Sequence, residues 1–311
     1  KEVKRKFFGT LYNTYSFFAL YANIDGFKYN EEDIPLEERP EIDQWIISLL
    51  NSLIKDVTQF YEDYEPTKAG RQIQHFVIEN LSNWYVRLNR KRFWGGNYTK
   101  KKISAYQTLY KCLETISLLS APIMPFYADK LFKDLNRVTG LHHEESVHLA
   151  KFPVHIEKHI NKGLEKQMDI AQRTTSMVLS LRRKVNIKVR QPLNKILIPV
   201  FSEEFKDQFE AVKNLVLTEV NVREVEYISD TSDVLVKKVK PNFKKLGPKY
   251  GKLMKQITAE LNKMEQKDIL QLEKEGQYTI SVGEQEIPLQ LDDVEIVSED
   301  IPGWLVTSDG E

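Results

Sequence analysis

The 311-residue sequence has a single cysteine, no net charge and no long apolar run. Cys112 alone can form neither an internal disulfide nor a thiolate-cluster metal site, which favours a reducing compartment, by default the cytoplasm. The 45 basic and 45 acidic side chains leave no overall field that would attract a nucleic acid or a membrane surface. No apolar segment approaches the roughly 20 residues that a bilayer-spanning helix needs, so no membrane partner is expected.

The charges that are present are unevenly distributed along the chain. Residues 25–43 carry eight acidic and two basic side chains, whereas residues 66–111 carry ten basic and one acidic. Residues 235–255 hold eight lysines and no acid, and from Glu260 onward fourteen acids stand against three lysines. Blocks of this kind often form solvated faces, so a block taken alone is weak support for a polyanion partner.

Apolar residues at helical spacing predict that the first half of the chain is helical. Five helices are expected, separated by turns that contain proline or glycine. They cover approximately residues 2–21, 40–64, 67–93, 98–120 and 122–137. Together they predict a five-helix bundle over residues 1–150, with Cys112 on an apolar stripe as a small buried residue rather than a nucleophile.

A connecting helix is expected over residues 151–185, and its apolar periodicity begins near residue 156. An α+β domain is expected over residues 186–311. In that domain the apolar period changes to two, which is typical of strands. Strands are predicted at 196–199, 220–227, 235–239, 278–282, 286–291 and 294–297, and helices at 203–215 and 249–264. The fold class is therefore mainly α, with a bundle, a connecting helix and a smaller, truncated α+β appendage.

The most informative motif ends the third expected helix and reads LSNWYVRLNRKRFW, residues 81–94. At about 100° per residue, Asn83, Arg87, Arg90 and Trp94 share one helix face. Arginines neutralise phosphates or stack under bases, an aromatic ring accepts an unstacked base, and an amide can read a base edge. The motif therefore predicts an RNA-binding face, although a basic helix end also complements its own dipole and Trp94 could cap the bundle.

Two further sets of basic residues are candidate contacts to an RNA backbone. Lysine supplies affinity rather than sequence reading. Three roles are open for the first set, the lysine run: contact with RNA, a solvated face, or pairing with the acidic segment after Glu260. The second set, at the domain junction, could extend the same RNA-binding path. The lysine run comprises Lys237, Lys238, Lys240, Lys244, Lys245, Lys249, Lys252 and Lys255, and the junction set Arg182, Arg183, Lys184, Lys188 and Arg190.

Neither a metal site nor an acid–base catalytic pair is expected. Five of the six histidines lie between residues 142 and 159, and His155 and His159 would share one face of the connecting helix, as a zinc pair requires. No cysteine lies nearby and the spacing of a four-ligand site is missing, so a polar surface is favoured. The carboxylates form no pattern that ties a pair of them to a nucleophile.

Four motifs resemble, in the same order, segments of the isoleucyl-tRNA synthetases, a family of class I aminoacyl-tRNA synthetases. Besides residues 81–94 they are KFFGTLYNTYSFFALYAN at 6–23, APIMPFYAD at 121–129 and IKVRQPL at 187–193, so the resemblance covers nearly the whole chain. The alanine-proline-x-x-proline-phenylalanine pattern is shared with the valyl, leucyl and methionyl enzymes. The first motif and residues 81–94 favour the isoleucyl family.

The resemblance implies that the bundle binds the anticodon stem-loop of tRNA(Ile), with the catalytic domain of the same polypeptide as a second partner. The His-Ile-Gly-His-type motif, the Lys-Met-Ser-Lys-Ser-type loop and the editing insertion are missing here, so neither ATP nor Mg is expected as a cofactor of this chain, although the family uses both for isoleucylation. By position in the matching motif, the implied tRNA contacts are Asn83, Trp84, Tyr85, Arg87, Arg90, Lys91, Arg92 and Trp94. Trp84 also lies on the apolar stripe, where core packing is the alternative.

Two other functions fit the same patterns. The equivalent part of a valyl-tRNA synthetase would have the same fold and would prefer a different tRNA. A protein-interaction scaffold would use the charged blocks to meet other proteins, and it would retain its partner when residues 81–94 are changed.

Overall fold

The computed structural model describes residues 2–200, 202–228, 236–283, 285–299 and 305–307. The chain divides into two compact units, Lys1–Lys166 and Gln167–Glu311, each of which has its own core. None of the described helices combines the length and the hydropathy of a transmembrane span.

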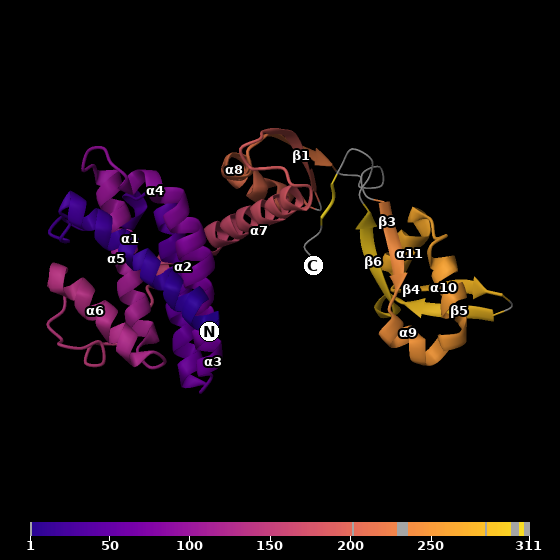
Figure 1. The fold of residues 1–311 in the computed structure, drawn as a ribbon, viewed down its shortest axis with the longest axis horizontal. Helices are drawn as coiled ribbons and strands as arrows, with labels where there is room; N and C mark the ends of the chain where they lie inside the picture. Colours follow the sequence, from indigo (N-terminus) through magenta and orange to yellow (C-terminus); the bar gives the residue numbers. More distant parts are fainter. Residues whose placement is uncertain (1, 201, 229–235, 284, 300–304, 308–311) are drawn as a thin grey trace. The chain divides into compact units, whose positions relative to one another are not determined.

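The first unit is a helical bundle, drawn from indigo to magenta in Figure 1, and it confirms the predicted fold class. Its helices end where the sequence forces a turn: Gly26 and Gly140 adopt left-handed φ values of 72° and 64°, and Pro66 begins a helix. The elements are η1 (Lys4–Phe8), α1 (Gly9–Asp25), η2 (Leu36–Glu38), α2 (Glu41–Glu62), α3 (Pro66–His75), η3 (Phe76–Val86), α4 (Arg87–Phe93), α5 (Lys100–Ser120), α6 (Pro125–Thr139) and η4 (Glu157–His159).

The third predicted helix is one unbroken helical segment made of α3, η3 and α4, and its centre is π-helical. A π-helix forms i→i+5 hydrogen bonds and holds more residues per turn than an α-helix. The buried face is therefore wider than the 3.6-residue period predicts, and the consecutive residues Trp84, Tyr85 and Val86 are all buried. Helices α1 and α2 both pack against this segment.

Helix α5 forms the centre of the bundle, since it contacts α1, α2, α3, α4 and α6. Nearly all of its side chains are buried, and Cys112 among them is fully inaccessible. Burial raises the pKa of the Cys112 thiol, so this group stays protonated and unreactive at neutral pH. The sequence-based prediction of a buried structural cysteine is confirmed.

The connecting helix, α7 (Lys162–Lys184), begins later than the predicted residue 156. Residues 157–159 instead form the short η4 turn, and Asn161 provides the helix cap because its Oδ1 accepts a hydrogen bond from the backbone N–H of Leu164 at 3.0 Å. Glu165 in the first turn of α7 accepts hydrogen bonds from the hydroxyls of Ser48 and Ser52 on α2, at 2.6 and 2.7 Å. The start of α7 is therefore fixed to the first unit by side-chain hydrogen bonds.

The second unit contains a βαβ element made of β1 (Leu193–Pro199), α8 (Glu203–Val220) and β2 (Val222–Ile228). The strands pair in parallel, with Leu193 opposite Val222, and α8 is the crossover that packs on β2. Ser202 caps α8 by accepting a hydrogen bond from Phe205, and Asn221 ends it at a left-handed φ of 52°. The predicted strand–helix–strand order is confirmed.

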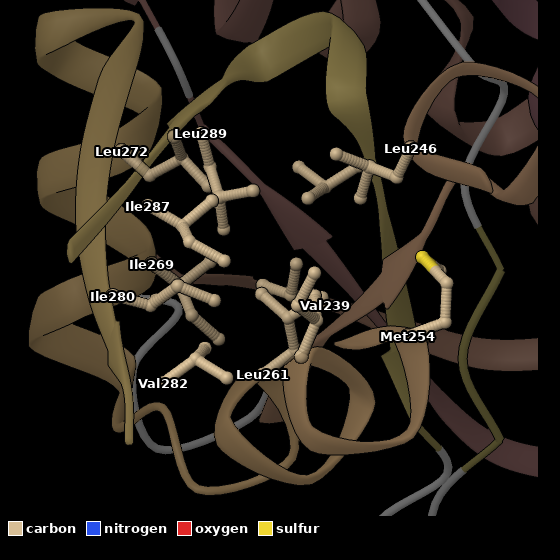
Figure 2. Packing of buried hydrophobic residues seen from close by; sticks show 12 residues of the cluster. Val239, Leu246, Met254, Leu261, Ile269, Leu272, Ile280, Val282, Ile287 and Leu289 are labelled. Carbon is tan, nitrogen blue, oxygen red and sulfur yellow. The ribbon is translucent and has the colours of Figure 1, made fainter. Parts of the chain in front are cut away.

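The rest of the second unit packs helices against two antiparallel strand pairs, β3–β6 and β4–β5. The predicted single helix over 249–264 is wrong, because α9 ends at Tyr250, the η5 turn begins at Gly251, and α10 covers only Met254–Leu261. Helix α11 was not predicted. Figure 2 shows the shared core, in which Val239, Ile269, Ile280 and Ile287 converge from strands and helices. The elements are β3 (Val236–Pro241), α9 (Phe243–Tyr250), η5 (Gly251–Leu253), α10 (Met254–Leu261), α11 (Gln266–Glu275), β4 (Gln277–Val282), β5 (Gln285–Gln290), η6 (Leu291–Asp293) and β6 (Val294–Glu299).

Candidate nucleic-acid interface

One end of the first unit, which we call the basic end, is formed by the last turn of α4, the loop 94–99 and the first turn of α5. Arg90, Lys91 and Trp94 are exposed there, and the Trp94 side chain is 53% accessible. Trp94 ends α4 through its backbone N–H, which donates to the carbonyl of Arg90 at 3.1 Å, and the chain turns at two glycines with positive φ. Neither cation has a hydrogen-bond or ion-pair partner within the described part of the chain. The basic end thus presents one aromatic ring and two cations to solvent.

Trp84 and Arg87 form a stacked pair one to two turns before this end. Trp84 is only 7% accessible, and the Arg87 guanidinium carbon lies 5.8 Å from the centroid of its ring. Arg87 Nε also donates to the backbone oxygen of Asn83 at 2.7 Å, and the Asn83 amide donates to Glu79 at 3.1 Å. The structure therefore places Trp84 in the core, and Asn83 and Arg87 on the surface in contact with neighbours on their own helix.

Tyr85 and Arg92 belong to a buried network centred on Asp43 of α2. The fully buried Asp43 carboxylate accepts hydrogen bonds from the Tyr85 hydroxyl at 2.8 Å and from both terminal nitrogens of Arg92 at 2.6 and 2.8 Å. Ser104 of α5 donates to the same carboxylate at 3.0 Å, and Arg92 also donates to the backbone carbonyl of Lys101. The network joins α2, η3, α4 and α5 immediately beneath the basic end.

Burial raises the pKa of Tyr85 well above its usual range, and the Asp43 charge adds to that shift. Burial alone would lower the pKa of Arg92, but its hydrogen bonds to Asp43 and the charges around it raise the pKa instead. Tyr85 is therefore a neutral hydrogen-bond donor, and Arg92 stays charged in a site that is largely closed to solvent. From the sequence we expected Tyr85 and Arg92 to contact RNA. Their polar atoms instead form hydrogen bonds inside the bundle, which disfavours that contact.

Three acidic residues of the 25–43 block pair with three basic residues of the 66–111 block at this end. Asp25 pairs with the buried Lys102 at 2.5 Å, Glu38 pairs with Lys100, and Asp43 pairs with Arg92. The Lys101 side chain stays exposed beside these pairs. Lys101 was not among the predicted RNA contacts, although its position in the basic block of residues 66–111 could have indicated such a role.

The junction residues have two different environments. Arg182 is 3% accessible and donates to the backbone carbonyls of Lys188, Gln191 and Asn221 at 3.2, 3.0 and 3.0 Å. These bonds connect the end of α7 and the following loop to the end of α8, and burial lowers the pKa of the guanidinium. Arg183, Lys184, Lys188 and Arg190 are exposed. These four exposed residues remain candidate RNA contacts, whereas Arg182 stabilises the fold of the second unit through its hydrogen bonds.

Replacing Arg182 with methionine is expected to lower the free energy of unfolding of the second unit by about 1–3 kcal/mol, because three carbonyls lose a buried charged donor. Urea denaturation followed by circular dichroism measures the change. Arg183→Met, at the exposed neighbouring position, is the matched control and should leave stability within about 0.5 kcal/mol of the parent. Equal effects of the two substitutions would contradict the structural role of Arg182.

Some lysines of the run pair with acidic residues, and others are exposed to solvent. Lys245 Nζ lies 2.8 Å from Asp292 and Lys249 Nζ lies 3.6 Å from Asp293, which is the pairing with the acidic segment that was one of the three alternatives. Lys240, Lys244, Lys252 and Lys255 are exposed, as is Lys238, which has an interaction of its own. Lys237 lies in β3, but its side chain is outside the described residues. Phe243, 64% accessible, adds an aromatic ring beside Lys244.

Two of the histidines, His142 and His155, lie beside carboxylates. The expectation of a common face for His155 and His159 is wrong, because the chain there forms the η4 turn and not an α-helix. His142 Nε2 lies 2.7 Å from Glu114, and His155 Nε2 lies 3.3 Å from Glu157. No group of three or more potential metal ligands occurs within the described ranges.

Comparison with known proteins gives a consistent result. A family model described as the anticodon-binding domain of tRNA ligase matches residues 43–198. Proteins named isoleucine–tRNA ligase are similar along the whole chain: that of Bacteroides fragilis is 62% identical over 311 residues, that of Porphyromonas gingivalis 56% over 310, and that of Clostridium tetani 38% over 316. The chain spans only 27–29% of the length of these relatives.

Proposed function

The chain belongs to the family of anticodon-binding domains of tRNA ligases, and from that premise we propose that it is the part of an isoleucine–tRNA ligase that binds the anticodon stem-loop of tRNA(Ile). The identity of the relatives supports the choice of isoleucine over valine, since the similar proteins from Bacteroides fragilis and Clostridium tetani both carry that name. The same similarity, along the whole chain, disfavours an unrelated interaction scaffold.

The basic end carries this proposal. An anticodon loop offers unpaired bases and closely spaced phosphates, which proteins bind by stacking on aromatic rings and by pairing with cations. Trp94 provides the exposed ring, and Arg90, Lys91 and Lys101 provide cations around it. The buried Asp43–Arg92 network supports these residues from beneath, so the surface is held in one geometry before RNA binds.

The exposed lysines of the second unit are additional RNA contacts in this proposal. Lys238, Lys240, Lys244 and Lys252 contact the sugar–phosphate backbone and add affinity without reading sequence. Arg183 and Arg190 at the junction contribute in the same manner. Lys245 has a smaller part, because Asp292 already pairs with it.

The full-length ligase would act in the cytoplasm and would use ATP and Mg to attach isoleucine to the tRNA whose anticodon this chain holds. Those steps belong to a catalytic domain outside residues 1–311. The contribution of this chain is to orient the tRNA, so that its acceptor end reaches that domain.

Binding of the chain to tRNA(Ile) across a salt series tests the proposal, with tRNA(Val) and a tRNA(Ile) of altered anticodon as comparators. We expect the tightest binding to unaltered tRNA(Ile), and a logarithmic affinity that falls linearly with the logarithm of salt concentration. Equal affinity for all three RNAs would contradict anticodon reading. A preference for tRNA(Val) would indicate the valine enzyme instead.

A further inference from the structure

The first turn of α9 exposes an aromatic ring in the middle of the lysine run. Phe243 is the first residue of α9 and is 64% accessible, whereas the other described aromatic rings of the second unit are buried or half-buried. A single exposed apolar side chain is common on protein surfaces and has no functional meaning by itself. The surroundings of Phe243 therefore decide what the ring can do.

The backbone that carries the ring is firmly anchored in the second unit. The backbone N–H of Asn242 donates to the carbonyl of Asp293 at 2.9 Å, and the Asn242 side chain caps α9 by accepting a hydrogen bond from the backbone N–H of Lys244 at 3.2 Å. Leu246, in the same turn of α9, is fully buried, and Figure 2 shows it within the hydrophobic core. Phe243 is therefore presented to solvent by a fixed helix start.

A glycine leaves the helix surface next to Phe243 uncovered. Helical side chains lean toward the N-terminus, so the residue four positions later normally covers a side chain on the same face. In α9 that residue is Gly247, and a Cβ at this position would meet open space. Glycine is also less favourable than alanine inside a helix, so it does not serve the stability of α9. The ring is thus accessible to a flat partner.

The charges around the ring favour an anionic partner. The lysine run contains no acid, and the two acids of η6 that approach it, Asp292 and Asp293, already pair with Lys245 and Lys249. Lys244 directly follows Phe243, is exposed, and its ammonium has no ion-pair partner in the part of the chain that the structure describes. An anion that reaches this turn of α9 therefore meets a free cation.

An accessible ring next to a free cation suits a single-stranded nucleotide. The base of such a nucleotide stacks on an aromatic ring, while its phosphate pairs with a cation. A base-paired duplex would use the cation alone, because its bases are already stacked on one another. Lys240 of β3 is exposed as well, but Glu295 lies opposite it in the β3–β6 pairing, so Lys244 is the residue that we assign to the phosphate.

We propose that Phe243 and Lys244 form a binding site for one unpaired nucleotide of the tRNA. The base stacks on the ring that Gly247 leaves open, and the phosphate pairs with the Lys244 ammonium. The identity of the RNA rests on the proposed function, whereas the site itself is formed within the second unit. Stacking on an aromatic ring tolerates every base, so this site adds affinity for single-stranded RNA without reading the anticodon.

Photo-cross-linking locates the nucleotide. A short oligouridylate that carries 5-iodouridine is irradiated together with the 311-residue chain, and the cross-linked peptides are identified by mass spectrometry. An iodinated base reacts with an aromatic ring on which it stacks, so we expect a cross-link at Phe243 that disappears in Phe243→Leu. A chain that gives no cross-link at Phe243 would overturn the proposal.

A second substitution covers the ring without removing it. Gly247→Met places a long apolar side chain in the open space beside Phe243 and changes no charge, so it should lower the cross-link yield at Phe243 about fivefold or more. Gly251→Met is the matched control, because a side chain at Gly251 also enters open space but lies outside α9. It should leave the yield unchanged, and an equal loss in both variants would contradict stacking on Phe243.

An abasic oligonucleotide of the same length separates stacking from charge. Both oligomers are titrated against the Trp94→Ala chain, so that the ring of the basic end does not mask the effect. Phe243→Ala should weaken binding of the oligouridylate about fivefold or more and leave binding of the abasic oligomer unchanged. Lys244→Ala should weaken both. Equal effects of Phe243→Ala on the two oligomers would overturn the proposal, as would displacement of the oligouridylate by polyglutamate, since an acidic protein would then fit the site.

The nucleotide site and the proposed function can fail separately. If the chain prefers tRNA(Ile) while Phe243 gives no cross-link, the nucleotide site fails alone. If Phe243 is cross-linked and Gly247→Met prevents it while the chain shows no preference among the tRNAs, the nucleotide site stands and the anticodon assignment fails. With tRNA(Ile) itself, Phe243→Ala should weaken binding and leave the salt dependence unchanged, since no charge is removed. Unchanged affinity for tRNA(Ile) would show that the nucleotide does not come from the tRNA, which overturns that part of the proposal.

Discussion

Asp43→Ala is expected to lower the free energy of unfolding of the first unit by about 3–5 kcal/mol, because it leaves the Arg92 cation without its partner in a largely buried site. Tyr85 and Ser104 lose a hydrogen-bond acceptor in the same substitution. Urea denaturation followed by circular dichroism measures the effect. Asp56→Ala removes an exposed carboxylate from the same helix and should change the free energy by less than about 0.5 kcal/mol.

A double-mutant cycle distinguishes pairing from simple loss of packing. Arg92→Met alone should be strongly destabilising, since it leaves the fully buried Asp43 carboxylate unpaired. Asp43→Leu combined with Arg92→Met removes both charges and should be more stable than the sum of the two single changes predicts. Strict additivity of the two changes would show that the ion pair does not couple α2 to α4.

The helices could be predicted from the sequence because their signals are local. Gly26 and Pro66 each mark a helix boundary by the backbone conformation that they allow, and both boundaries are observed. The Asp43–Arg92 pair could not be predicted in this way, because its residues are 49 positions apart and either one reads as an ordinary surface charge. The π-helical centre of the long helix likewise has no signal in a pattern that assumes 3.6 residues per turn.

Some of the residues that the sequence predicts as RNA contacts are exposed and others are buried, and their positions in the fold explain this difference. Arg90 and Trp94 lie on the surface because they follow the π-helical segment, where the regular spacing holds again. Tyr85 lies inside the π-helical segment, and its widened buried face takes the ring into the core. Arg182 was predicted to extend the RNA path at the domain junction, and the three carbonyls that it binds come together only after β1 and α8 have folded.

Trp94→Ala is expected to weaken binding of tRNA(Ile) by about 1–3 kcal/mol, roughly 5- to 150-fold, because an exposed ring that stacks on a base is lost. The salt dependence should be unchanged, since no charge is removed. Arg90→Ala should instead reduce the slope of logarithmic affinity against logarithmic salt concentration by about 0.7, the contribution of one phosphate contact to an unpaired strand. Titrations at several salt concentrations therefore separate stacking from phosphate contact at the same end of the bundle.

Phe126→Ala is the matched control for Trp94→Ala, because it removes an aromatic ring from the opposite end of the same unit. The Phe126 ring is more exposed than that of Trp94, at 91% against 53%. It should leave both the affinity and the slope unchanged. If Trp94→Ala and Arg90→Ala also leave both quantities unchanged in a folded protein, the RNA does not contact the basic end. The exposed lysines of β3, α9 and η5 would then be the main RNA-binding surface, and this chain would supply electrostatic attraction without reading the anticodon.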